Sequence, residues 1–172
     1  MPLIDEKNHP ELSELIAKIK GARRGRLINI YRLMLHSPAL ANAWFELNQA
    51  VRYGSEIDGQ SRELAIIRVA ILNDVEYVHR AHAPVYALQE GLTPAQIDAL
   101  ANWESSALFD DKQRALLAYV DAMTRDIDVP DEVFANLRAH HSERQIIEIT
   151  MLIGTYNMLT RFLKALQVDP EP

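Results

Sequence analysis

The chain has 172 residues, of which 48% are apolar and 24% are charged, and its formal net charge at pH 7 is −6. This length fits a single domain, because one hydrophobic core commonly serves about 100 to 200 residues. The negative charge argues against nucleic acid or an anionic membrane as the main partner, since both would repel the protein. No basic stretch followed by an apolar run opens the sequence. No apolar run reaches the roughly 18 residues of a membrane span, so we expect a cytoplasmic protein.

Apolar residues recur at helical spacing along nearly the whole chain, whereas the two-residue alternation of half-buried strands is rare. We therefore predict an all-α helical bundle. A short helix at 11–20 precedes a core at about 27–166, and residues 167–172 are expected to fray. Within the core, the pattern predicts helices near 27–36, 37–53, 58–72, 74–82, 93–100, 110–126, 130–140 and 143–166.

The helix that starts at Ser37 and Pro38 is expected to turn one stripe toward the core, formed by Leu40, Trp44, Leu47 and Val51. The next helix, capped by Asp58, is apolar on all sides from 64 to 72 except at Arg68, which predicts the central helix of the bundle. Residues 146–163 are similarly apolar. Together these two segments carry more apolar surface than a small monomer can cover. We therefore predict an obligate homo-oligomer.

Two residues with acid/base chemistry lie in this region. Glu63 is near the start of the central helix, and His82 follows Val75 and Val78 at helical spacing, so these last three share a face. Histidine suits proton transfer because its unperturbed pKa is about 6.5. The apolar neighbours of Glu63 are expected to raise the pKa of its carboxyl group. Both residues also have a purely structural interpretation, since packed histidines and carboxylates in first helical turns are common.

Other residues nearby have weaker cases. Arg68 could neutralise Glu63 or hold a substrate carboxylate, and it could equally be the buried partner of a core acid. Tyr86 shares the face of His82 only if Pro84 kinks the helix without ending it. A metal could be held on one helix face, but two histidines without a carboxylate-rich partner helix are common by chance. That face would comprise Glu76, His79 and His82. We expect no metal ion and no cofactor.

Residues 27–166 resemble the carboxymuconolactone decarboxylase family, which also contains the alkylhydroperoxidase D-like proteins. The stretches that carry the resemblance are 63–68, NDVEYVHRAH, EGLTPAQIDAL and IGTYNMLTRFLKAL. In the peroxidase branch, a glutamate is followed twelve residues later by Cys-x-x-Cys and then, after four more residues, by a histidine. The chain keeps this spacing with valine at both cysteine positions: Glu63, Val75, Val78 and His82. Another branch has Cys-Glu-Tyr-Glu-Trp here, of which Glu76 and Tyr77 match two positions.

The resemblance implies an all-helical fold, homotrimers or homohexamers, and pockets near subunit contacts. It carries over Glu63 and His82, but not the redox pair. Peroxide reduction by a dithiol needs a thiolate and a resolving thiol, and the chain has no cysteine. In the decarboxylase branch, carbon dioxide leaves a lactone acid and the remaining carbon is reprotonated.

We therefore expect a cofactor-free lyase or isomerase that acts on a small organic acid or lactone. His82 is the predicted general acid/base, and Glu63 orients it or shares its proton. The expected substrate-binding residues are Tyr77, His79, Arg68, Val75, Val78 and Tyr86. Two alternatives stay open. One is a non-catalytic oligomeric binding or scaffold protein, and the more distant one is a metal-dependent enzyme that uses His79 and His82.

Overall fold

The computed structural model describes residues 1–171, and all regular structure in that part of the chain is helical, which confirms the predicted class. The longer helices are α1 (Ser13–Gly21), α3 (Pro38–Tyr53), α4 (Gly59–Leu72), α7 (Asp111–Arg125), α8 (Asp131–His140) and α9 (Glu143–Ala165). The shorter ones are α2 (Asn29–Met34), α5 (Glu76–Ala81) and α6 (Pro94–Ala99), with single turns η1 (Glu6–Asn8), η2 (Pro10–Leu12), η3 (His82–Ala87) and η4 (Leu100–Ser105). Within residues 1–171, no helix combines the length and apolar character that crossing a bilayer requires.

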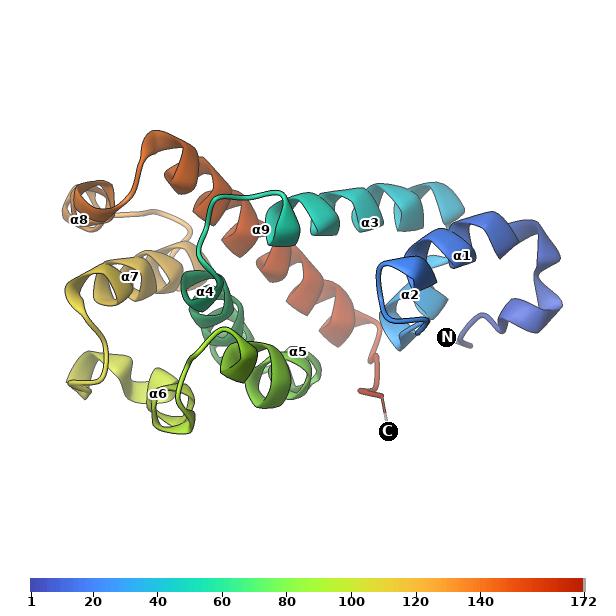
Figure 1. The fold of residues 1–172 in the computed structure, drawn as a ribbon, viewed down its shortest axis with the longest axis horizontal. Helices are drawn as coiled ribbons and strands as arrows, with labels where there is room; N and C mark the ends of the chain where they lie inside the picture. Colours follow the sequence, from blue (N-terminus) through green and yellow to red (C-terminus); the bar gives the residue numbers. More distant parts are fainter. Residues whose placement is uncertain (172) are drawn as a thin grey trace.

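Helix α4 is the central helix of the bundle that it forms with α5, α7 and α9, as its sequence predicted (Figure 1). Its start is fixed by Asp58, whose carboxylate accepts a hydrogen bond from the N–H of Ser61 at 2.8 Å. Residues 63–70 are buried without interruption, and α4 packs against α7, α9, α5 and η3. Because the rest of the chain covers residues 63–70, this part of α4 offers no apolar face to a partner, contrary to the expectation drawn from its composition.

Helix α3 is rotated relative to the prediction. Leu40 was expected inside but is 69% exposed, whereas Trp44 and Val51 are buried as predicted. The buried stripe includes a second row of residues at spacings of three and four: Ala41, Phe45, Asn48 and Arg52. The small Ala41 lets α3 approach its neighbours closely, and the larger Leu40 is left outside. Two polar side chains on this row consequently enter the interior.

The helix that carries His82 continues past Pro84. Helix α5 runs directly into η3, a π-helical turn, and the chain stays helical to Gln89. Proline lacks a backbone N–H and its ring clashes with the preceding turn of an α-helix. The wider π-helical turn accommodates this defect without breaking the helix. His82 and Tyr86 therefore share a face, with ring centroids 5.2 Å apart.

A buried ion pair ties α4 to α7. Nε and Nη2 of Arg68 donate hydrogen bonds to the two carboxylate oxygens of Asp121, each at 2.6 Å. Nη1 of Arg68 donates to two carbonyl oxygens at the start of η4, and Nε1 of Trp103 donates to Asp121 at 3.3 Å. Arg68 is thus the partner of a core acid, and that acid is Asp121 and not Glu63.

The last described residues pack against the body of the protein. The carboxylate of Glu171 accepts hydrogen bonds from the N–H of Asn29 and the hydroxyl of Tyr77, both at 2.7 Å. The carbonyl of Asp169 accepts another from the Asn29 side chain at 3.2 Å. The expected fraying is therefore wrong for residues 168–171, because polar groups on α2 and α5 hold this segment. The same expectation for Pro172 lies outside the described residues.

We expect Asp121→Ala to lower the free energy of unfolding by about 3–5 kcal/mol, because it leaves the buried guanidinium of Arg68 without its counter-charge. Urea denaturation followed by circular dichroism measures the change. Asp128→Ala removes an exposed loop carboxylate and should change stability by less than about 0.5 kcal/mol. Equally small losses for both variants would contradict a structural role for the ion pair.

Candidate active site

Glu63 and His82 meet in the interior, as the resemblance to the family led us to expect. Helix α4 positions the glutamate and η3 positions the histidine. Nδ1 of His82 lies 2.6 Å from Oε2 of Glu63, and the two residues are 6% and 0% exposed. The other carboxylate oxygen of Glu63 accepts a longer hydrogen bond, at 3.3 Å, from Nε of Arg62. Both oxygens of this buried carboxylate are thereby satisfied.

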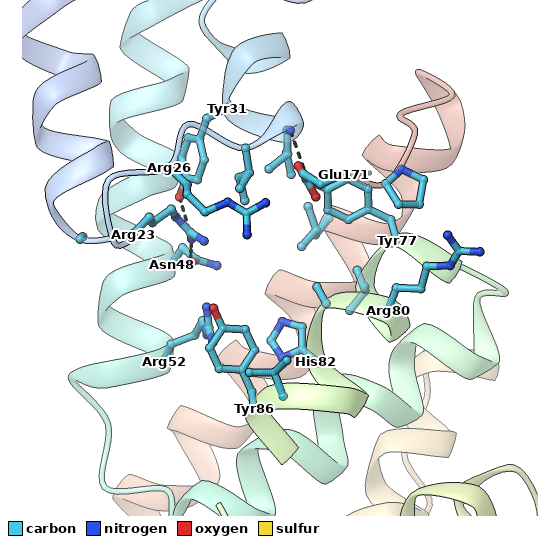
Figure 2. Close-up of a pocket in the computed structure, with 18 of the residues that line it drawn as sticks. Arg23, Arg26, Tyr31, Asn48, Arg52, Tyr77, Arg80, His82, Tyr86 and Glu171 are labelled. Atoms are coloured by element: carbon cyan, nitrogen blue, oxygen red, sulfur yellow. Dashed lines mark hydrogen bonds between the residues drawn. The ribbon is translucent and has the colours of Figure 1, made fainter. Parts of the chain in front are cut away.

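His82 forms part of the wall of a cavity of about 490 Å³ (Figure 2). The cavity lies between α2 and α3 on one side and α5 and η3 on the other, with α9 and residues 170–171 completing it. Its volume falls within the roughly 300–1,000 Å³ typical of small-molecule sites. Much of the wall is aromatic, contributed by Tyr31, Trp44, Tyr53, Tyr77, Tyr86 and Tyr156. Such a wall suits a ligand with a flat apolar body.

The environment lowers both pKa values of the acid/base pair. Burial raises the carboxyl pKa of Glu63, but the hydrogen bond and charge of His82, together with Arg52 and Arg62, outweigh it and leave the pKa below its usual value. The apolar neighbours were expected to raise this pKa, and that prediction is wrong because the buried carboxyl has polar partners. Burial lowers the pKa of His82 and outweighs the opposing effect of Glu63. At neutral pH, the neutral imidazole donates its Nδ1–H to an ionised carboxylate.

This tautomer leaves the lone pair of His82 on Nε2. The hydroxyl of Tyr156 lies 3.4 Å from Nε2, and the two rings meet edge to face. Burial raises the pKa of Tyr156 to about 12, so its hydroxyl stays protonated and acts as a donor. An imidazole oriented by a carboxylate at one nitrogen and with an unprotonated second nitrogen has the arrangement of a general base.

The cavity wall is strongly cationic although the chain is acidic overall. Five arginines contribute to it: Arg23, Arg24, Arg26, Arg52 and Arg80. Among the described lining residues, Glu171 is the one with an acidic side chain. Local positive charge of this kind attracts anions, so the cavity favours a negatively charged ligand.

The structure brings some of the other predicted residues to this cavity and not the rest. Tyr77, Val78 and Tyr86 line it. Val75 is buried but does not reach the wall, and His79 faces a second, shallow groove beside Pro84. Arg68 is held in its ion pair with Asp121.

The metal-binding face considered from the sequence is not assembled, because His79 and His82 line different cavities. Glu76 forms an ion pair with Arg80. Residues 1–171 contain no group of three histidine, aspartate or glutamate side chains placed to hold a metal ion.

Several residues at the cavity were not predicted from the sequence, among them Arg52, Tyr156 and Glu171. Arg52 follows Asn48 by four residues on the buried row of α3, and Tyr156 falls three residues after Ile153 on the apolar stripe of α9. A polar residue at regular spacing within an apolar stripe is a signal that could have identified both. Glu171 follows no such pattern, and only the folded chain reveals it.

The geometry defines a helical domain in which one acid/base pair faces an arginine-rich cavity. Residues 38–122 match the model of the carboxymuconolactone decarboxylase family. The protein YnjA of Escherichia coli is 30% identical over 121 residues, which cover 70% of this chain and 66%, just under two thirds, of YnjA. The match over residues 38–122 agrees with the resemblance found in the sequence, and the chain has no cysteine.

Solved structures share the fold. A peroxidase-related protein from Silicibacter sp. TM1040 aligns with a TM-score of 0.83 at 23% identity, over 99% of this chain and 89% of that one. The debrominase Bmp8 in complex with 2,3,4-tribromopyrrole aligns with a TM-score of 0.82 at 21% identity, over 98% and 90% of the two chains. At these identities the likeness establishes the fold alone.

We expect the imidazole of His82 to titrate with a pKa below 6.5 and to carry its proton on Nδ1 at pH 7, because burial disfavours the imidazolium. Nitrogen-15 NMR of labelled histidine measures both. In Glu63→Gln, the pKa of His82 should fall further, since the carboxylate that favours the charged ring is gone. A His82 pKa of 6.5 or above would contradict the assigned state.

Proposed function

We propose that the protein is a cofactor-free proton-transfer enzyme, a decarboxylase-like lyase or an isomerase, that acts on a small organic acid or lactone. The observation that carries the proposal is the 2.6 Å contact between His82 and Glu63 at the wall of a cationic cavity. To remove a proton from a carbon atom of an organic acid, an enzyme needs an oriented base and a site that binds the negative charge of the acid. The cavity offers both.

In the proposed reaction, Nε2 of His82 removes a proton from a carbon next to a carbonyl group of the bound acid. The electron pair of the broken C–H bond moves into the carbonyl to form an enolate, and the imidazolium formed on His82 is stabilised by the carboxylate of Glu63. Where the carbonyl is conjugated to a C=C bond, the anion is a dienolate, and return of the proton from Nε2 to its far carbon gives an isomer. In the decarboxylase variant, Nε2 of His82 first takes up a proton from water. The C–C bond to the substrate carboxylate then breaks, carbon dioxide leaves, the electron pair moves into the neighbouring carbonyl group, and the imidazolium returns its proton to the resulting carbanion.

The fold by itself does not select this reaction, because its structural relatives include a debrominase and a peroxidase-related protein. Thiol chemistry is set aside because the chain has no cysteine. We also propose a cytoplasmic location. The chain is acidic and has no cysteine, so it cannot form the disulfides that often stabilise proteins in oxidising surroundings.

A second candidate is a non-catalytic protein that binds a small anion. The cationic wall supports binding whatever the chemistry, and the contact between Glu63 and His82 would then serve only to satisfy two buried polar groups. The two candidates differ in what happens when the pair is disabled: a binding protein keeps its ligand, whereas an enzyme loses turnover.

We expect His82→Ala and Glu63→Gln each to lower turnover by roughly 10²-fold or more, because each disables the positioned base. A panel of lactone and β-keto carboxylic acids can be screened for carbon dioxide release and for ultraviolet absorbance changes. His140→Ala removes an exposed histidine and should leave the rate unchanged. Variants of the pair that lose stability but keep full activity per folded molecule would show that Glu63 and His82 are structural.

We also propose a homo-oligomer, a trimer or hexamer, as the resemblance implies. The face that supports it is on α9, where Ile147, Met151 and Met158 are each at least 46% exposed and lie on one helical stripe. Light scattering at micromolar concentration should give a trimeric or hexameric mass, and Met151→Glu should lower it. Ile127→Glu alters an exposed loop residue and should not. A monomeric wild-type protein would contradict the proposal.

A further inference from the structure

Arg52 is a buried cation without an ionic partner. It is 4% exposed, and within residues 1–171 its side chain makes no hydrogen bond or ion pair, so that Nε is left unsatisfied. Burying a charge without a partner is costly, and such residues are normally paired. Arg68 provides a comparison within the same chain. It is buried to the same degree, but its guanidinium donates hydrogen bonds to Asp121 and to two carbonyl oxygens. The contrast points to a partner for Arg52 that residues 1–171 do not supply.

The guanidinium of Arg52 is held in a defined position at the cavity wall. It lies over the rings of Tyr53 and Tyr86, at 4.9 Å from each ring centroid. Figure 2 shows Arg52 beside Tyr86 and near His82, on the side of the cavity where the acid/base pair reaches the wall. A guanidinium fixed by two rings presents its fork of donors in one orientation, which suits a planar carboxylate.

The opposite side of the cavity already holds a carboxylate. There the side chain of Glu171 is bound by Tyr77 and by the N–H of Asn29. The carboxylate of Glu171 thus lies against the same cavity wall but is bound to groups other than Arg52. Within residues 1–171, no anionic group forms an ion pair with Arg52. The aromatic wall between the two sides would cover the flat body of a ligand.

We propose that Arg52 binds the carboxylate of a planar aromatic or conjugated acid and places the body of that acid beside Nε2 of His82. This inference rests on the proposed function and names its substrate class. Binding requires no chemical step, so it can be tested independently of turnover.

Isothermal titration calorimetry with benzoate tests the proposal, and benzamide serves as the neutral ligand of the same shape. We expect wild-type protein to bind benzoate saturably at millimolar concentration or below and to bind benzamide at least 10-fold more weakly, as expected for loss of a charge-assisted contact of about 1.5–3 kcal/mol. Arg52→Gln should weaken benzoate binding by about 10- to 100-fold for the same reason, and Arg52→Lys should restore part of it. Arg138→Gln makes the same change of charge on the exposed face of α8 and should leave benzoate affinity unchanged.

The thermal midpoint gives a second readout. Without ligand, Arg52→Gln should be at least as stable as wild type, because it removes an unpaired buried charge. Three results would overturn the proposal: no saturable benzoate binding to wild type, equal binding by Arg52→Gln, or tighter binding of inorganic phosphate than of benzoate. His82→Ala and Glu63→Gln should still bind benzoate. If those two variants lose turnover but Arg52→Gln binds benzoate as wild type does, the proposed role of Arg52 is wrong. The acid/base proposal is then retained.

Discussion

The burial of two charged residues on one central helix is the constraint on which this structure depends. Glu63 and Arg68 lie five positions apart on α4, so they point to different sides of the helix, and neither can be left without a partner in the interior. Arg68 is satisfied by Asp121 of α7, and Glu63 by His82 of η3. Because each partner comes from a different helix, these two contacts fix how α7 and η3 are placed around α4.

The two buried contacts differ in whether they leave a hydrogen-bonding group free to meet a ligand. All three nitrogens of the Arg68 guanidinium donate hydrogen bonds within the protein, so that side of α4 is structural. On the other side, His82 uses Nδ1 to bond Glu63 and keeps the lone pair of Nε2 for the cavity, where only a weak contact with Tyr156 competes for it. The π-helical turn at Pro84 contributes by keeping His82 and Tyr86 on one face, so that a tyrosine ring and the imidazole border the same cavity.

Most of the fold followed from the sequence because helical spacing and helix caps are local signals. Asp58 and Ser142 begin helices as predicted, and the interior of α4 is as buried as its composition indicated. Leu40 was misplaced because small Ala41 beside it takes the inward position, which depends on how closely neighbouring helices approach. The pairing of Glu63 with His82 was expected from the resemblance to the family. The pairing of Arg68 with Asp121 had no such support, and periodicity does not specify which residues of two helices meet. Arg52 could have been noticed as a polar residue on the buried row of α3, but its place at the cavity, like that of Glu171, appears only when α3, α5 and residues 170–171 enclose one cavity.

The central claim is that the lone pair of His82, held in place by Glu63, removes a proton from carbon. The most direct test is hydrogen exchange in heavy water, followed by proton NMR, with carboxylic acids that carry an acidic C–H next to a carbonyl group. The account predicts that wild-type protein introduces deuterium at that carbon faster than buffer alone, and that His82→Ala does not. If His82→Ala introduces deuterium as fast as wild type, or if wild type binds these acids and exchanges none of their C–H protons, the acid/base account is wrong.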